Sequence, residues 1–287
     1  VAMGENALAN NTTAAQNTGL GQNALLTNTT GASNVAVGHD ALRLNTTASN
    51  NIAVGVDALR ANTTGSENVA VGLDALKANT TASDNVGLGH SALEGNTTGA
   101  ENTAVGKNAL GANTTASYNT AVGKGALQAT TTGQANTALG VDVLVANTTG
   151  LDNTAVGTSA LSANTTGASN TVVGRATGSS ITTGSNNLML GHDAGITGSP
   201  GGNLTTGSNE IALGDENIAS ASIQVDWTVA SDQRDKTDFT ALDLGLDFVK
   251  ALAPVTYKWD KRSKYGDKTA DDYDITNYTP DGTHKED

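Results

Sequence analysis

A pattern of 17 residues repeats along the first two thirds of the chain, marked by one glycine in every period. From Gly4 to Gly191 these glycines occur at every seventeenth position without a change of register. With this glycine as position 0, position −1 is Val, Leu or Met, position −2 is small in the first ten repeats, and position −3 is Val, Ile, Leu or Thr. An unbroken short period predicts one supersecondary unit stacked on copies of itself.

Positions −3 to −1 alternate in a way that predicts a short β-strand, with −1 and −3 on one face and −2 on the other. We expect −1 and −3 to face the core. There they would meet the leucine of an Ala-Leu pair at +3 and +4, such as Ala58 and Leu59, in which we predict a second short strand. Position −2 accepts only small residues, so either the solenoid is very flat or another chain packs on that face.

Asparagine recurs at position −4 eleven times, from Asn17 to Asn187. In parallel strands about 4.8 Å apart, such side chains hydrogen-bond along the stack as a ladder. An Asn-Thr-Thr segment at +7 to +9 predicts a polar turn, and the repeated glycine indicates a positive φ or a close backbone approach. The sequence therefore predicts an all-β fold, a parallel β-roll or β-helix solenoid of 17-residue coils over residues 1–191.

The composition adds an expectation about assembly, because the repeats have few bulky side chains to bury. Aromatic residues make up 3% of the 287 residues, and the chain has 34 glycines and no cysteine. Thin coils bury little surface alone and leave parallel edges uncovered, so we expect a homotrimeric fibre. The net charge of −13 argues against nucleic-acid binding, and no apolar run reaches the roughly 18–20 residues that membrane insertion requires.

The composition changes sharply near residue 230, which predicts a further domain. Eight of the nine aromatic residues follow residue 226. Leu244, Phe248 and Leu252 are spaced as one helix face, and residues 255–259 alternate as a strand. We therefore expect irregular terminal coils and a neck over residues 192–230 and a small α+β segment over residues 231–287.

The repeats resemble the head of trimeric autotransporter adhesins, in strands such as Asn34 to Gly38 and Asn153 to Gly157. That resemblance implies a parallel β-roll in a trimer, with the small −2 face as the trimer contact. The period differs, because the coil of that family is shorter than the 17 residues found here.

The segments Ser231–Lys236 and Gly245–Trp259 resemble the C-terminal intramolecular chaperone of endosialidases and other phage tail spikes and fibres. The resemblance implies a segment that trimerises, assists folding of the preceding β-structure and often cleaves itself off. It makes Ser231 the nucleophile and Lys236 its base, a serine-lysine pair that cuts between Ala230 and Ser231. The alternative is a folding module that never cuts. We expect the chain to be a fragment that lacks the later helical part of that domain.

These features predict a structural protein of a phage tail fibre, located in the virion tail. Its expected partners are two further copies of itself, other virion tail proteins and a host cell-surface receptor, either a glycan or a protein. The alternatives are a trimeric adhesin on the bacterial cell surface and, less favoured, an ice-binding solenoid that uses its threonine columns. A polysaccharide-cleaving enzyme would need paired carboxylates, and no such pair recurs in the repeats.

Candidate metal ligands are sparse in the repeats. Histidine occurs at +1 in three coils, as His39, His90 and His192, without a partner at the spacing that a metal site requires. We therefore expect no metal and no cofactor, and self-cleavage, once per chain, is the one catalytic activity considered.

Overall fold

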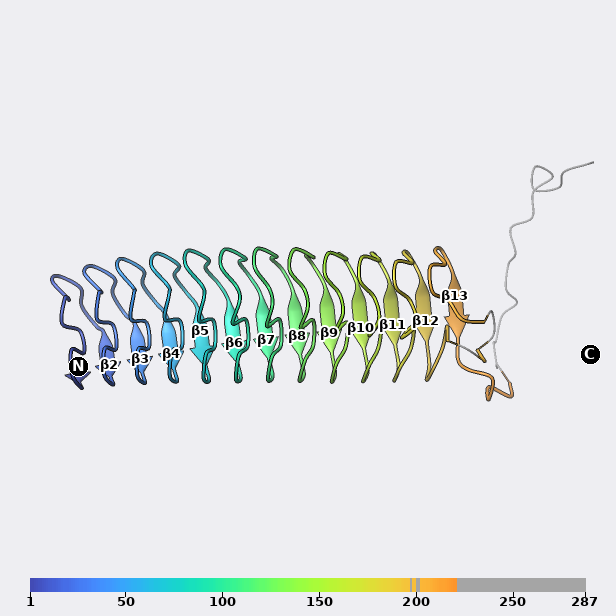
Figure 1. Cartoon of the computed structure of the whole chain (residues 1–287), viewed down its shortest axis with the longest axis horizontal. Helices are drawn as coiled ribbons and strands as arrows, with labels where there is room; N and C mark the ends of the chain where they lie inside the picture. The colour runs from blue at the N-terminus through green and yellow to red at the C-terminus, as the bar shows by residue number, and fades with distance from the viewer. Residues whose placement is uncertain (197, 200–201, 221–287) are drawn as a thin grey trace, which may run out of the picture. The chain divides into compact units, whose positions relative to one another are not determined.

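The computed structural model describes residues 1–196, 198–199 and 202–220, which form a parallel β-solenoid (Figure 1). Thirteen short strands follow one another in chain order and form one sheet. The strands are β1 (Ala2–Met3), β2 (Thr18–Leu20), β3 (Val35–Val37), β4 (Ile52–Val54), β5 (Val69–Val71), β6 (Val86–Leu88), β7 (Thr103–Val105), β8 (Thr120–Val122), β9 (Thr137–Leu139), β10 (Thr154–Val156), β11 (Thr171–Val173), β12 (Leu188–Leu190) and β13 (Ile211–Leu213). The predicted all-β solenoid is confirmed.

The chain divides into two units, Val1–Ser222 and Ile223–Asp287. The α+β segment expected over residues 231–287 lies outside the described residues, and so does most of the neck. Within the described coils there is no helix, and hence none that is long and apolar enough to cross a membrane.

Strand pairing reproduces the sequence period. Val35 lies beside Ile52, and Ile52 beside Val69, so that each coil advances by 17 residues. Between β12 and β13 the advance is 23 residues, because Leu188 pairs with Ile211. The six-residue insertion seen in the sequence is therefore held in the connection between these strands, and the pairing itself continues unbroken.

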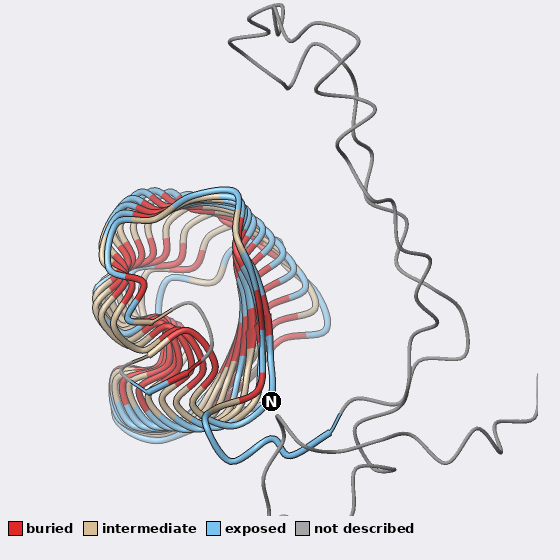
Figure 2. Cartoon of the chain, turned by 90° about the vertical axis from the view of Figure 1, so that its right-hand side faces the viewer, coloured by how far each residue is buried: buried red, intermediate tan, exposed pale blue. Residues whose placement is uncertain are grey.

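The strand face that turns inward is the opposite of the predicted one. Ala36, at −2, is fully buried, whereas Val35 and Val37 beside it are only partly buried. The −2 residue meets the leucine at +4 across the coil, since a Cβ added to Gly87 would lie 3.3 Å from Leu76 Cγ. The core is thus a thin layer of alanine and leucine, which appears as continuous bands of buried positions in Figure 2. The expectation that −1 and −3 face the core was wrong, and the flat-solenoid alternative explains the small −2 residues.

The Ala-Leu pair does not form the predicted second strand either. Positions +2 to +7 form tight turns, in which Asp40 has a φ of 56° and Leu42 a φ of 50°. Aspartate tolerates this left-handed conformation, whereas for leucine it costs about 1–2 kcal/mol. Leu42 is fully buried, and its N–H donates to the Ala58 carbonyl oxygen of the next coil at 3.0 Å. Burial and this hydrogen bond offset the unfavourable backbone conformation.

The repeat glycine is required for both reasons that the sequence suggested. Gly72 has a φ of 139°, and a Cβ added there would lie 2.5 Å from the carbonyl oxygen of Gly89. No side chain fits where consecutive coils approach this closely at the same backbone atom. Stacking of coil on coil therefore explains why glycine returns at every seventeenth residue.

Two asparagine ladders run inside the solenoid. At −4, the backbone N–H of Asn34 donates to Asn17 Oδ1 and its Nδ2 to the Ala48 carbonyl oxygen, both at 2.8 Å. At +7, Asn45 Nδ2 donates to Asn28 Oδ1 at 2.8 Å and to the same Ala48 oxygen at 3.0 Å. The predicted −4 ladder is confirmed, and the +7 ladder joins it at a shared carbonyl, so that the ladders tie the strand to the turn.

Beyond Gly174 the core is rebuilt by compensating exchanges. Glycine replaces the +4 leucine at Gly178 and Gly195, while Met189 replaces the small residue at −2. A Cβ at Gly195 would lie 2.4 Å from Met189 Sδ, and Met189 is fully buried. The methionine therefore fills the volume that the missing leucines leave.

Candidate functional site

Ser231 and Lys236, the predicted nucleophile and base, lie outside the described residues. The described coils present other features with binding or chemical potential. These are a ladder of ion pairs beside a groove, two histidine clusters, columns of threonine and an exposed apolar stripe.

Aspartates at +2 and basic residues at +5 of three successive coils form a ladder of ion pairs. Each aspartate that has a following basic coil pairs both within its coil and with the next: Asp40 Oδ2 lies 3.2 Å from Arg43 Nη1 and 3.5 Å from Arg60 Nε. The ladder consists of Asp40, Arg43, Asp57, Arg60, Asp74 and Lys77. Three negative and three positive charges therefore neutralise one another along one side of the solenoid.

The electrostatics of the ladder keep its members ionised. Burial raises the pKa of Asp40, but the hydrogen bond from Asn23 and the charges of Arg43, His39 and Arg60 outweigh it, so the pKa lies below its ordinary value. Hydrogen bonds to two aspartates of the ladder raise the pKa of Lys77. Neither shift moves a group toward neutral pH, which is where a general acid or base would be needed.

A groove of about 610 Å³ lies beside the ladder. Its lining residues are Leu44, Arg60, Ala61, Lys77, Ala78, Glu94, Gly95 and Gly111. Arg60 and Lys77 are already paired with aspartates, and none of the lining residues is aromatic. The groove thus presents no free positive charge for an acidic ligand and no ring on which a sugar could stack.

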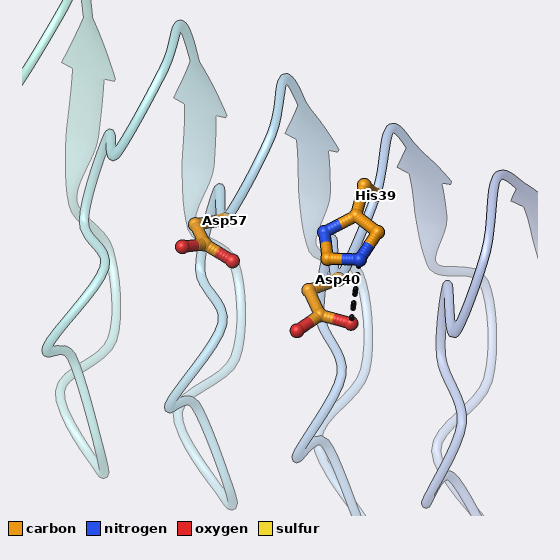
Figure 3. A group of neighbouring side chains, drawn as sticks. All are labelled: His39, Asp40 and Asp57. Carbon is orange, nitrogen blue, oxygen red and sulfur yellow. Dashed lines mark ion pairs between the residues drawn. The ribbon is translucent and has the colours of Figure 1, made fainter.

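His39, Asp40 and Asp57 come together on two adjacent coils, as Figure 3 shows. One potential ligand atom of each lies within 4.8 Å of the others, and His39 Nε2 lies 3.8 Å from Asp40 Oδ1. The sequence did not indicate this group, because stacking rather than chain proximity makes Asp57 a neighbour of His39. Both carboxylates already pair with basic residues of the ladder, so a cation would have to displace them, and we assign no metal site here.

A second histidine cluster links the last regular coil to the coil of β13. His192 Nδ1 lies 3.3 Å from Asp193 Oδ2 and 3.4 Å from Asp215 Oδ2, and Arg175 Nη1 lies 2.6 Å from His192 Nε2. The imidazole is half exposed. The cluster connects three consecutive coils at the point where the 23-residue advance occurs.

The threonine columns are partly engaged in the solenoid itself. Thr46 Oγ1, at +8, donates to the Thr63 carbonyl oxygen of the next coil at 3.1 Å, and this bond recurs along the stack. Thr47, at +9, is exposed. Only the +9 column is left with hydroxyl groups free to order water, so the structure adds no support to the ice-binding alternative.

An apolar stripe runs along the outside of the sheet. We define the outer stripe as the first and third residues of strands β2 to β13, which are the −3 and −1 positions. None of these residues is charged, and several are well exposed, such as Ile52 at 41%, Leu139 at 48% and Ile211 at 63%. The sequence expectation turned this stripe inward. The small −2 residue opposite a large +4 leucine was the signal that identifies the inner face.

Comparison with known proteins bears on the C-terminal segment. Residues 231–275 match the family model described as the chaperone of endosialidase. No curated protein and no solved structure matches the chain. The family match confirms the predicted resemblance of this segment. Together with the β-solenoid, it fits a phage tail fibre that carries an endosialidase-type chaperone segment.

Proposed function

We propose that this chain is a structural protein of a phage tail fibre, assembled as a homotrimer in the virion tail. The observation that carries the proposal is the chaperone of endosialidase match at residues 231–275, placed after a solenoid of parallel coils. A stacked solenoid lengthens by about 4.8 Å with each coil, which suits a part whose role is reach. The fibre would hold a host-contacting surface, bind other tail proteins and engage a cell-surface glycan or protein.

The three predicted parts divide this work. Residues 1–191 are the rod, residues 192–230 form the terminal coils and neck, and residues 231–287 begin the intramolecular chaperone. Parallel pairing between distant residues is slow, because loop-closure entropy is lost before the contacts form. A terminal segment that brings three chains together in register would speed this step and protect the unpaired coils from aggregation.

Self-cleavage before Ser231 is part of the proposal. The Ser231 hydroxyl adds to the Ala230 carbonyl carbon while its proton passes to Lys236. The bond between Ala230 and the Ser231 nitrogen then breaks as the nitrogen takes up a proton, which leaves an ester. Water hydrolyses that ester and releases residues 231–287. The step happens once per chain and consumes one water molecule.

One sample tests assembly and cleavage together. We expect light scattering to give the mass of three 28.7 kDa chains, about 86 kDa, less any released segment. A denaturing gel should show a band shortened by the segment after Ala230. The Ser231→Ala variant should remain full length, and Ser220→Ala, a control upstream of the bond, should be cut normally.

The outcomes of this experiment are separable. A monomeric mass for both the cut and the uncut chain would contradict the fibre. An uncut chain with the mass of a trimer would contradict self-cleavage and leave the fibre standing, with the chaperone acting as a folding module.

The bacterial surface adhesin remains the second candidate, and the likeness of the repeats to autotransporter heads favours it. Antibodies against residues 1–191 distinguish the two locations. We expect them to label the tails of purified phage particles, whereas labelling of the surface of uninfected bacteria would favour the adhesin.

A further inference from the structure

The two flanks of the outer stripe carry opposite charge. At −5, just before each strand, the exposed residues include Glu67, Asp84, Glu101 and Asp152, and no described coil has a basic residue there. At +1, just after each strand, they include the basic residues Lys107, Lys124 and Arg175 and the histidines His39, His90 and His192. The acids at +1 are Glu5 and Asp215, in the first and last described coils. We call these columns the acidic flank and the basic flank.

Strand direction determines where the flanks lie. Each strand has three residues at most and runs across the solenoid, side by side with the next (Figure 1). The acidic flank therefore lies at the start of every strand and the basic flank at its end, with the outer stripe between them. Charges of opposite sign share a coil, as Asp84 and His90 do, and Glu101 and Lys107.

We infer that the outer stripe is the interface between copies of this chain, packed parallel and in register, with the acidic flank of one copy against the basic flank of the next. This inference rests on the proposed function for the number of copies, which is three. Three strands at one level would then form a triangle, with the stripe facing the axis and each strand end meeting the start of the next strand.

Charge complementarity selects identical, parallel copies as the occupant of the stripe. Two copies that face each other in parallel place the acidic flank opposite the basic flank, whereas antiparallel copies place like charge opposite like charge. The stripe has no charged residue along its whole length, so copies can pack on it without desolvating a charge. Exposed ion pairs add little affinity. The flanks therefore set orientation and register, and apolar burial supplies the association.

The assignment also moves the contact between chains from the face that the sequence suggested. Position −2 is occupied by the core of its own coil and is fully buried at Ala104 and Ala121. No atom of a neighbouring chain can reach it. The exposed −1 and −3 positions are the residues of the same strands that remain available for such a contact.

Paired cysteines test the face and the register. The chain has no cysteine of its own, so Glu101→Cys with Lys107→Cys gives one defined pair per interface. Within one chain the two positions lie at opposite ends of an extended strand, which is beyond the roughly 4–7 Å between Cα atoms that a disulfide spans. We expect oxidation, or a short bismaleimide, to convert the full chain into covalent trimers that either single variant does not form.

A shifted pair serves as the matched control. Glu101→Cys with Lys124→Cys displaces one partner by a coil, and we expect far less cross-linking from it. Native mass is measured on the same samples. A trimeric mass without cross-links in the in-register pair overturns the proposed interface and leaves the fibre intact. A monomeric mass overturns the fibre. Equal cross-linking of both pairs contradicts the register.

Lysine substitutions give a second readout on the stripe. Val71 and Leu139 are 38% and 48% exposed on the stripe, whereas Leu44 and Leu151 are 40% and 45% exposed elsewhere. Each side chain lies outside the core of its own coil, so the fold of one copy should survive the change. We expect Val71→Lys and Leu139→Lys to lower the unfolding temperature of the trimer and Leu44→Lys and Leu151→Lys to leave it unchanged. Equal effects of the two sets would overturn the inference.

Discussion

A single residue interrupts the +7 asparagine ladder at Thr130. Asn113 Oδ1 is buried and has no hydrogen-bond partner in the described structure, because the residue above it is a threonine. Asn147 Nδ2 reaches only Thr130 Oγ1, at 3.5 Å. A buried acceptor without a partner is costly, so this small departure from the repeat is also a local weakness of the rod.

Restoring the ladder should stabilise the protein. We expect Thr130→Asn to raise the free energy of unfolding by about 1 kcal/mol, since it supplies a donor to Asn113 and an acceptor to Asn147. Ile181→Asn is the contrasting change. It also places asparagine at +7 but removes a fully buried apolar side chain, so it should destabilise. Thermal unfolding followed by circular dichroism measures both, and no gain from Thr130→Asn would mean that water or backbone relaxation already satisfies Asn113.

At the scale of the element, the turns that link the strands are held by the ion-pair ladder. Folding lowers the pKa of Asp40, so its pairs stabilise the fold above the ordinary value of 3.8 and lose this contribution as the pH falls through the lower, folded value. Folding raises the pKa of Lys77. Its contribution is therefore complete below 10.5 and is lost as the pH rises through the folded value.

The ladder can be tested by its pH dependence. We expect Asp40→Asn to unfold at a lower temperature than the wild type at pH 7, and the difference to shrink as the pH falls toward 2 (about two units below the ordinary pKa of an aspartate). Asp142→Asn is the matched control, because Asp142 also stands at +2 but is followed by Val145 at +5. A difference that does not change with pH would show that Asp40 acts through packing and not through its charge.

For the whole molecule, the solenoid behaves as a one-dimensional stack in which each coil contacts its neighbours. Deleting residues 86–102 removes one full period of 17 residues and joins Asn85 to Thr103. We expect this variant to keep the β-sheet spectrum and cooperative unfolding of the parent chain.

A deletion that is one residue shorter is the control. Removing residues 86–101 shifts every later strand by one residue and reverses its inner and outer faces. This variant should unfold at a much lower temperature and be cut readily by protease. Similar behaviour of the two deletions would contradict the one-dimensional description.

Much of the fold is determined by the sequence alone, because period and residue type act locally. The spacing of Gly38 and Gly55 defines the coil, the alternation from Val35 to Val37 marks a strand, and Asn34 predicts a ladder. The segment Ser231–Lys236 pointed to the chaperone family that residues 231–275 match. The roles of Ser231 and Lys236 themselves remain predictions.

Only the tertiary structure decided which strand face is buried, because an alternating pattern has two faces and does not name the inner one. The choice depends on what lies across the coil: Leu76 leaves room for Gly87 but not for Val86 or Leu88. The same closure bends Leu76 into a left-handed turn instead of a strand. Stacking also brought Asp57 beside His39 and Met189 beside Gly195. These neighbours come from the next coil or from across the core, so volume and register in three dimensions place them where local spacing cannot.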